Sequence, residues 1–270
     1  MSKTTPAPKR FRIHHFADKK ARREPITMLT CYDAVTARLF DESGVDSLLV
    51  GDSYGNTLLG YSSTIPVRLE EILVATGAVA RGAARAFVVA DLPFGSYEES
   101  PAQAVRSAVR LMKAGANAVK LEGGTRQAPA IEAIVKAGIP VVGHVGFTPQ
   151  SENALGGPRV QGRTDEGRAA VIDDAVAVQD AGAFAVVLEM VPADLASKVT
   201  KIVRIPTIGV GAGAGTDGQV LVWTDMAGMT GWTPRFSRSF GHVGDALRAA
   251  AADFCTAVRA REFPGPEHSF

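Results

Sequence analysis

Strand-like and helix-like segments alternate about eight times along the 270 residues, and this predicts a (β/α)8 TIM barrel with a short N-terminal helical extension. The strand-like segments are almost wholly apolar, as expected for parallel strands that helices cover. An open doubly wound sheet would fit the alternation equally well. The barrel is favoured because polar residues end five different strands, and a closed barrel brings such ends to one mouth.

Length and composition fit one globular domain, since barrels of this kind commonly reach about 250 residues. We expect residues 1–24 to form a basic tail and short helix, and residues 25–270 to form a single catalytic domain. The net charge of +1 argues against binding to nucleic acid. No apolar run approaches the ~20 residues of a membrane span, and two cysteines without metal-binding spacing favour a cytoplasmic setting.

The basic N-terminus, residues 1–24, holds eight lysines and arginines against Asp18 and Glu24. It lacks the apolar core of a secretory signal, and Pro6 and Pro8 interrupt any long amphipathic helix. The segment is therefore expected to be a frayed tail followed by a short surface helix.

The first half of the chain supplies four strand and helix pairs. Residues 26–30 predict the first strand, and the helix at 33–43 can end at Gly44. The second strand, at 47–52, leads through a glycine-containing loop to a helix at 68–81. A strand at 86–91 precedes a helix at 101–114, whose first turn suits Pro101. The fourth strand, at 118–122, is followed by a helix at 127–137.

The second half continues the pattern around a long loop. A strand at 139–144 precedes residues 145–164, a stretch rich in glycine that is typical of a lid or binding loop. A helix at 166–181, a strand at 184–190, a helix at 193–201 and a strand at 206–211 follow. Residues 219–223 are the candidate eighth strand, and 245–260 a closing helix.

One phrase of the sequence occurs twice, at 114–122 and at 181–189. Because side chains alternate along a strand, Lys120 and Glu122 face the same way. In the second occurrence the acid is kept as Glu189, whereas Val187 replaces the lysine. A short buried strand that ends on an acid is thus used more than once.

Three acids, Asp52, Asp91 and Glu122, end consecutive strands. Carboxylates brought together in this way repel one another unless a cation lies between them, and Mg²⁺ is bound by such oxygens. Each acid alone could instead cap a helix or form a surface ion pair. The repeated placement favours a metal site.

Three further residues are candidates for chemistry at the same mouth. Lys120 could pair with acids, hold an anionic substrate or form a Schiff base, and anion binding is favoured beside a metal. His144 is either a buried, satisfied histidine or a ligand or proton carrier. Glu189, without a lysine beneath it, is a candidate general base or a hydrogen-bonding support.

The glycine-rich run at 209–215 does not match dinucleotide-binding spacing. Backbone amides after the seventh strand of a barrel often hold phosphate, so an anion role is one alternative. Close packing of the backbone is the other.

The chain resembles the ketopantoate hydroxymethyltransferase (3-methyl-2-oxobutanoate hydroxymethyltransferase) family in a series of phrases that keep the family's order. These phrases are VGDS at 50–53, ADLPF at 90–94, VKLEGG at 119–124, GHVGFTPQS at 143–151, VQGR at 160–163, LEMVP at 188–192, IGVGAG at 208–213, DGQ at 217–219 and EHSF at 267–270. A series of this length is far more specific than any one phrase.

The resemblance implies a cytoplasmic (β/α)8 barrel enzyme that assembles as a homodecamer, a pentamer of dimers arranged as two pentameric rings. It implies Mg²⁺ as cofactor, 3-methyl-2-oxobutanoate as substrate and 5,10-methylenetetrahydrofolate as one-carbon donor, with 2-dehydropantoate as the product for pantothenate biosynthesis. By motif, it makes Asp52, Asp91 and Glu122 the metal site, Asp52, Ser53, Asp91 and Lys120 substrate contacts, and Glu189 and His144 catalytic residues.

The expected reaction passes through an enolate that Mg²⁺ stabilises after a base such as Glu189 removes the C3 proton. Three departures from the family's phrases, Tyr54, Glu152 and Thr164, lie in loops near the mouth and bear on the fit of folate. Two rival functions are a folate-independent, Mg²⁺-dependent 2-keto acid aldolase or lyase and a non-catalytic ring-forming binding protein.

Overall fold

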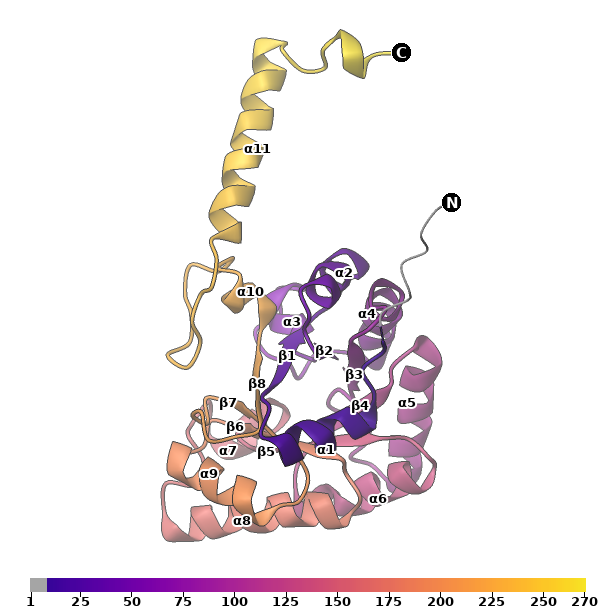
Figure 1. The fold of residues 1–270 in the computed structure, drawn as a ribbon, viewed down its shortest axis with the longest axis vertical. Helices are drawn as coiled ribbons and strands as arrows, with labels where there is room; N and C mark the ends of the chain where they lie inside the picture. Colours follow the sequence, from indigo (N-terminus) through magenta and orange to yellow (C-terminus); the bar gives the residue numbers. More distant parts are fainter. Residues whose placement is uncertain (1–8) are drawn as a thin grey trace. The chain divides into compact units, whose positions relative to one another are not determined.

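Residues 9–270 are described by a computed structural model, and within them eight parallel strands form a closed barrel in chain order (Figure 1). Each strand pairs with the next, and β8 returns to pair with β1. The predicted TIM barrel is confirmed, and the open sheet is excluded by this closure. The strands are β1 (Ile26–Thr30), β2 (Ser47–Val50), β3 (Phe87–Asp91), β4 (Ala118–Glu122), β5 (Val141–Gly146), β6 (Ala185–Glu189), β7 (Thr207–Val210) and β8 (Gly218–Leu221).

Up to Leu221, helices alternate with the strands and lie outside the barrel (Figure 1). The predicted helix at 101–114 has an ordinary N-terminal cap: the Ser100 side chain accepts a hydrogen bond from the Gln103 amide, and Pro101 begins the helix. The helices are α1 (Ile13–Arg22), α2 (Ala34–Glu42), α3 (Tyr54–Thr57), α4 (Leu69–Gly82), α5 (Pro101–Ala114), α6 (Ala128–Lys136), α7 (Glu152–Leu155), α8 (Asp165–Asp180), α9 (Ala193–Ile202), α10 (Trp223–Met226) and α11 (Val243–Ala260), with 3₁₀ turns η1 (Thr125–Gln127), η2 (Pro149–Ser151) and η3 (Pro266–His268).

Two strand ends differ from the prediction in ways that matter for the site. β2 stops at Val50, and the Asp52 amide donates to the Asp91 side chain instead of continuing the ladder. β5 runs two residues past His144, because Gly146 still pairs with Glu189 of β6. The stretch at 145–164 is also not one open loop, since η2 and α7 lie within it.

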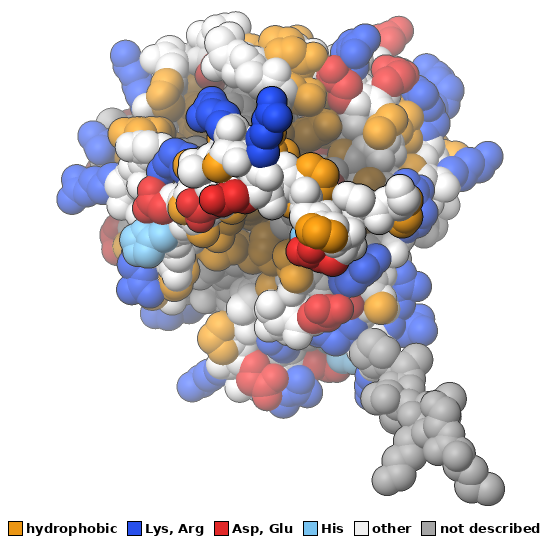
Figure 2. Space-filling model, turned by 90° about the horizontal axis from the view of Figure 1, so that it is seen from above, with side chains coloured by type: hydrophobic (Ala, Val, Ile, Leu, Met, Phe, Trp, Pro, Cys, Tyr) orange, Lys and Arg blue, Asp and Glu red, His pale blue; other side chains and the backbone are white. Residues whose placement is uncertain are grey.

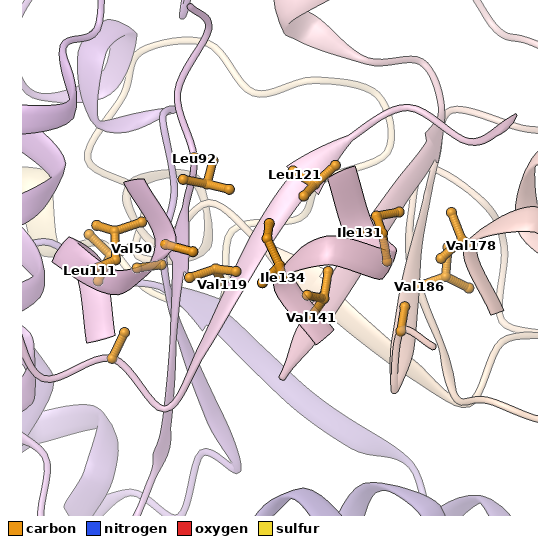
Figure 3. Close-up of a cluster of buried hydrophobic side chains, with 14 of the residues drawn as sticks. Val50, Leu92, Leu111, Val119, Leu121, Ile131, Ile134, Val141, Val178 and Val186 are labelled. Atoms are coloured by element: carbon orange, nitrogen blue, oxygen red, sulfur yellow. The ribbon is translucent and has the colours of Figure 1, made fainter. Parts of the chain in front are cut away.

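The interior of the barrel is filled by alternate residues of the strands. Val89, Val142 and Val187 face inward with a set of mostly apolar neighbours, and nearly all of this set is buried. A second cluster lies between the strands and the helices, where Val50, Leu121 and Val186 pack against helix residues such as Leu111 and Ile131 (Figure 3). Strands buried on both faces explain the continuous apolar runs in the sequence.

Helix α1 is anchored at the N-terminal end of the barrel. Phe16 is fully buried, and its ring meets the edges of Phe87 and Phe184 at centroid distances of 5.3 and 5.1 Å. Lys19 and Lys20 of the same helix form 2.7 Å ion pairs with Asp46 and Asp217. The predicted short helix is present, and the burial of Phe16 attaches it to the barrel core. Residues 1–8 of the predicted tail lie outside the described residues.

The chain divides into two compact units, Met1–Leu221 and Val222–Phe270. The first contains the whole barrel. The second contains α10, α11 and η3, and α11 exposes an apolar stripe that includes Leu247, Phe254 and Val258. Whether residues 25–270 act as a single domain stays a prediction.

The surface carries charges of both signs. On the face shown in Figure 2, basic and acidic side chains are interspersed with apolar ones, as expected for a chain with a net charge of +1. Among the described residues, no helix combines the length and apolar character needed to cross a membrane.

Candidate active site

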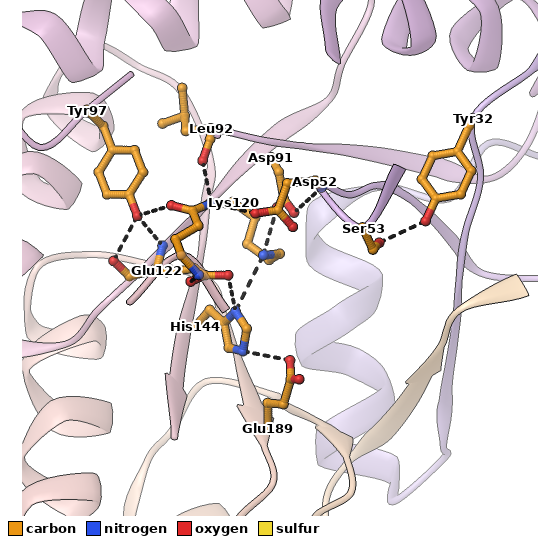
Figure 4. Close-up of polar contacts among 11 residues, drawn as sticks. Tyr32, Asp52, Ser53, Asp91, Leu92, Tyr97, Lys120, Glu122, His144 and Glu189 are labelled. Carbon is orange, nitrogen blue, oxygen red and sulfur yellow. Dashed lines mark hydrogen bonds and ion pairs between the residues drawn. The ribbon is translucent and has the colours of Figure 1, made fainter. Parts of the chain in front are cut away.

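Strand register brings the polar residues of the sequence to the C-terminal mouth of the barrel. Asp91 is the register partner of Lys120, and Glu122 is the partner of His144. Glu189 ends β6, beside the end of β5. Figure 4 shows these side chains pointing toward one another from neighbouring strands. The five polar strand ends that the sequence predicts are therefore brought together.

Lys120 lies at the centre of this group. Its Nζ is 2.8 Å from Asp91 Oδ1 and 3.5 Å from His144 Nδ1, and the lysine is buried. Burial lowers the pKa of Lys120, but attraction to Asp91, Glu122 and Asp52 outweighs it and raises the pKa above its usual value. The surrounding acids thus favour the charged form of Lys120, which disfavours the Schiff-base role because that role needs a neutral amine.

His144 bridges two glutamates. Its Nδ1 lies 3.3 Å from Glu122 Oε1, and its Nε2 lies 3.2 Å from Glu189 Oε2. Burial and Lys120 oppose the charged imidazole, but the close contacts with Glu122 and Glu189 outweigh them and raise the pKa of His144 to about 9. Although Val187 replaces the lysine on β6, Glu189 still has a basic partner, because His144 of the adjacent strand β5 lies beside it.

Glu189 differs from Glu122 in its access to the mouth. The side chain of Glu189 is 18% exposed, whereas that of Glu122 is 1% exposed. Burial alone would raise the pKa of Glu122, but hydrogen bonding and attraction to His144, together with Lys120, hold it below its usual value. Of the two glutamates, Glu189 can meet a bound molecule.

Asp52 is a buried acid among other acids. Burial, followed by repulsion from Asp91 and Glu122, raises the pKa of Asp52 to about 8. The Asp91 carboxyl likewise has a raised pKa because of burial, which Lys120 partly offsets. Added positive charge next to this pair would relieve the repulsion.

Two residues of the site, Gln150 and Tyr97, are not among the candidates that the sequence indicates. The Gln150 side chain donates to Asp52 Oδ2 at 2.8 Å, and its backbone amide donates to Glu122 Oε2 at 2.9 Å. Tyr97 donates to Gln150 Oε1 at 2.6 Å. Gln150 lies inside a family-like phrase, but nothing in its spacing marks it as a partner of strand-end acids.

Ser53 lies beside Asp52 at the start of the short helix α3 (Figure 4). Its hydroxyl is 2.8 Å from the Tyr32 hydroxyl. The ring of Tyr32 is stacked on that of Tyr54, with centroids 5.1 Å apart. Tyr54 therefore has a packing partner in this fold, which accounts for an aromatic side chain at that position.

The donor chemistry of the acids fits Mg²⁺, which prefers carboxylate oxygens. Asp91 Oδ1 and Glu122 Oε1 are buried and meet cations, but neither is in hydrogen-bonding geometry among the described residues. Within residues 9–270, however, no three histidine, cysteine, aspartate or glutamate side chains converge at metal-binding distances. Lys120 occupies the centre, so direct ligation requires the acids to turn from the lysine toward an ion.

The glycine-rich run after β7 is explained by close packing. A Cβ at Gly213 would lie 2.5 Å from Ala193 Cβ, and one at Gly215 would lie 2.9 Å from Ser197 Cβ. Both contacts are with α9, so the backbone of the run lies directly against that helix. This observation favours the packing alternative over an anion cradle.

Solved structures share this fold at low sequence identity. A phosphonopyruvate hydrolase, described in complex with oxalate and Mg²⁺, has a TM-score of 0.62 at 13% identity and covers 95% of this chain and 92% of its own. A 2,3-dimethylmalate lyase of the PEP mutase/isocitrate lyase superfamily has a TM-score of 0.59 at 16% identity, covering 94% and 92%. At these identities the likeness establishes the barrel architecture alone.

Sequence relatives are much closer. A 3-methyl-2-oxobutanoate hydroxymethyltransferase of Leifsonia xyli is 59% identical over 98% of this chain and 96% of its own length. One of Rhodococcus jostii is 59% identical over 96% of this chain and 90% of its own. The family model for ketopantoate hydroxymethyltransferase matches residues 10–266. Agreement at this level over nearly the whole length places the chain in the ketopantoate hydroxymethyltransferase family.

Proposed function

We propose that this protein transfers a hydroxymethyl group from 5,10-methylenetetrahydrofolate to 3-methyl-2-oxobutanoate, forming 2-dehydropantoate for pantothenate biosynthesis. The observation that carries the proposal is the group of buried acids around Lys120, joined through His144 to the more exposed Glu189. Family membership supports the same reaction.

Binding of the keto acid is assigned to Lys120 and Ser53. The substrate carries one negative charge, and Lys120 is a buried cation at the mouth. Ser53 lies at the start of α3, after β2, where its hydroxyl can donate to a carboxylate oxygen while Tyr32 donates to Ser53. Charge neutralisation by Lys120 would then fix the substrate among groups that otherwise repel it.

Asp52 and Asp91 would hold Mg²⁺ directly. Glu122 would act through a water molecule, because Gln150 N and His144 already engage its two oxygens. When bound, Mg²⁺ supplies positive charge that polarises the keto group of the substrate. This role fits Asp52 in particular, since its raised pKa reflects burial and repulsion that a divalent cation would offset.

Proton removal from C3 of the keto acid is assigned to Glu189. Its ion pair with His144 Nε2 leaves the carboxylate partly exposed at the mouth. His144 holds Glu189 in place and balances its charge before the proton arrives. The methylene carbon exchanges its two bonds to folate nitrogens for one bond to C3 and one to the oxygen of a water molecule. The proton taken from C3 and one proton of that water end on the two nitrogens, so the products are 2-dehydropantoate and tetrahydrofolate.

Activity of the full-length protein with both substrates tests the proposal. 2-Dehydropantoate should form only with methylenetetrahydrofolate and Mg²⁺, and formation should stop on chelation. Turnover of the keto acid with free aldehyde but not with the folate would instead identify a 2-keto acid aldolase. No turnover with either donor would leave the ring-forming binding protein as the better explanation.

The base is tested separately by exchange of the C3 proton in deuterated water without folate. Glu189→Gln should lower the exchange rate by about 10²–10⁴-fold, the usual contribution of a positioned base. Asp41→Asn, a change of an acid that binds backbone amides away from the mouth, is the matched control. Unchanged exchange in Glu189→Gln would transfer the base role to His144.

A cytoplasmic homodecamer, a pentamer of dimers, belongs to the same proposal. The exposed apolar residues of α11 support burial of that helix against another chain. Light scattering of the purified protein should give about ten times the 28.3 kDa mass of one chain. A monomer mass would contradict this assembly.

A further inference from the structure

Gln150 is a buried polar residue to which the proposed reaction gives no role. It lies in η2 after β5 and is 4% exposed. Its Nε2 donates to Asp52 Oδ2 at 2.8 Å and to the Leu92 carbonyl at 3.0 Å, while its Oε1 accepts from the Tyr97 hydroxyl at 2.6 Å. Both the oxygen and the nitrogen of the Gln150 side-chain amide therefore have hydrogen-bond partners.

The chemistry of the partners sets the orientation of the amide. A carboxylate oxygen and a backbone carbonyl only accept hydrogen bonds, so Nε2 must face Asp52 and Leu92. Tyr97 can donate to Oε1 and completes the arrangement. A flipped amide would direct its carbonyl oxygen at the Leu92 carbonyl, which can only accept, so the observed orientation is favoured.

Gln150 also links β2 to β4, two strands that are separated in the barrel by β3. Asp52 follows β2, Leu92 follows β3 and Glu122 ends β4. The backbone amide of Gln150 donates to Glu122 Oε2 at 2.9 Å, so one residue holds both Asp52 and Glu122. The distance between those two carboxylates therefore depends on a residue that follows a different strand, β5.

We infer that Gln150 is a positioning residue that fixes the carboxylates of Asp52 and Glu122 relative to each other at the mouth of the barrel. The inference rests on the proposed function only in giving those acids Mg²⁺ as their ligand. Buried polar groups around metal ligands typically contribute 10–100-fold to affinity or activity. Without Gln150, Asp52 would lose a donor and could rotate away from the mouth.

Two variants test the inference in the full-length protein. Gln150→Met fills nearly the same space without donors, and Gln150→Asn keeps an amide that is too short to reach both Asp52 and Leu92. Calorimetric titration with Mg²⁺ alone should give about 10–100-fold weaker binding for Gln150→Met and at least about 5-fold weaker binding for Gln150→Asn. Gln127→Met is the control, because Gln127 is similarly buried at 8% but contacts none of the three acids.

Wild-type Mg²⁺ affinity in both variants would overturn the inference, since a space-filling residue is replaced well by methionine. The same loss in Gln127→Met would overturn it too, by pointing to a general effect of burial. A crystal structure of Gln150→Met shows the position of the Asp52 carboxylate directly. A carboxylate rotated from its position in the unchanged protein supports the inference, and an unmoved one refutes it. Failure of the proposed function would be seen separately, in the wild-type protein, as absence of folate-dependent turnover.

Discussion

Replacing Gly143 with alanine should strain the packing of β5 against α8. An added Cβ would lie 2.3 Å from Cγ1 and 2.9 Å from Cγ2 of Val178, which is fully buried. Valine on a helix has one strongly preferred rotamer, so it cannot turn aside at low cost. Overpacking of this kind costs about 1–3 kcal/mol of unfolding free energy. The strain falls one residue before His144, so activity should decrease together with stability.

Val178→Ala removes both methyl groups that the new Cβ would meet. Alone, it leaves a cavity and should cost about 1–3 kcal/mol, because two buried carbons are lost. In the double variant, the two methyl groups of Val178 on α8 are gone, and the methyl group that Gly143→Ala adds on β5 takes part of their space. The double variant should therefore be more stable than the sum of the single changes predicts, by about 1 kcal/mol or more.

Urea unfolding at a fixed protein concentration measures all three variants, with Gly231→Ala as a control because no atom lies within 4 Å of its added Cβ. The slope of the transition should be unchanged, so that midpoints report stability. Exchange of the substrate C3 proton should fall in Gly143→Ala and recover in the double variant. Additive costs without recovery would refute the proposed contact and its link to His144.

Three further outcomes are expected. Phe16→Ala should lower the unfolding free energy by about 3–5 kcal/mol, measured by denaturant titration, because its ring completes the barrel core; a change below about 1 kcal/mol would contradict that role. Lys120→Met should cost about 3–5 kcal/mol by leaving buried acids without their cation, and a wild-type melting temperature would refute the lysine-centred arrangement. In Cys255→Ser, a thiol reagent at pH 8 should leave Cys31 unlabelled in the folded protein, because Cys31 is buried and burial raises its pKa to about 12; labelling as fast as in the urea-unfolded protein would be the contrary result. The Cys31 thiol loses its proton near pH 9 in the unfolded chain but only near pH 12 in the folded protein. The stability that this difference contributes is therefore present below pH 9 and is lost as the pH rises toward 12.

The fold could be predicted because its determinants are local. Each strand is a short apolar run buried on both faces, and each ends near a glycine, proline or polar residue that begins the next segment. The period of two within a strand also fixes that Lys120 and Glu122 share a face. These features need no knowledge of distant contacts. They fit an open sheet equally well, and the closed barrel is favoured because polar residues end five of the strands.

The placement of α1 could not be predicted in this way. Its composition is basic and its length short, which by itself indicates a loosely attached segment. Phe16 becomes a core residue only because Phe87 and Phe184, far along the chain, leave space at the end of the barrel. Burial of that kind is a property of the assembled strands.

The sequence by itself determined which polar residues end the strands of this barrel, because alternation and strand length place Asp91, Glu122 and Glu189 near the same edge. Only the tertiary structure decided how they are paired. Register set Lys120 beside Asp91 and placed His144 between two glutamates. The path of the chain after β5 brought Gln150 to Asp52, 98 residues away. Such pairings depend on long-range register and loop path, which local residue patterns do not encode.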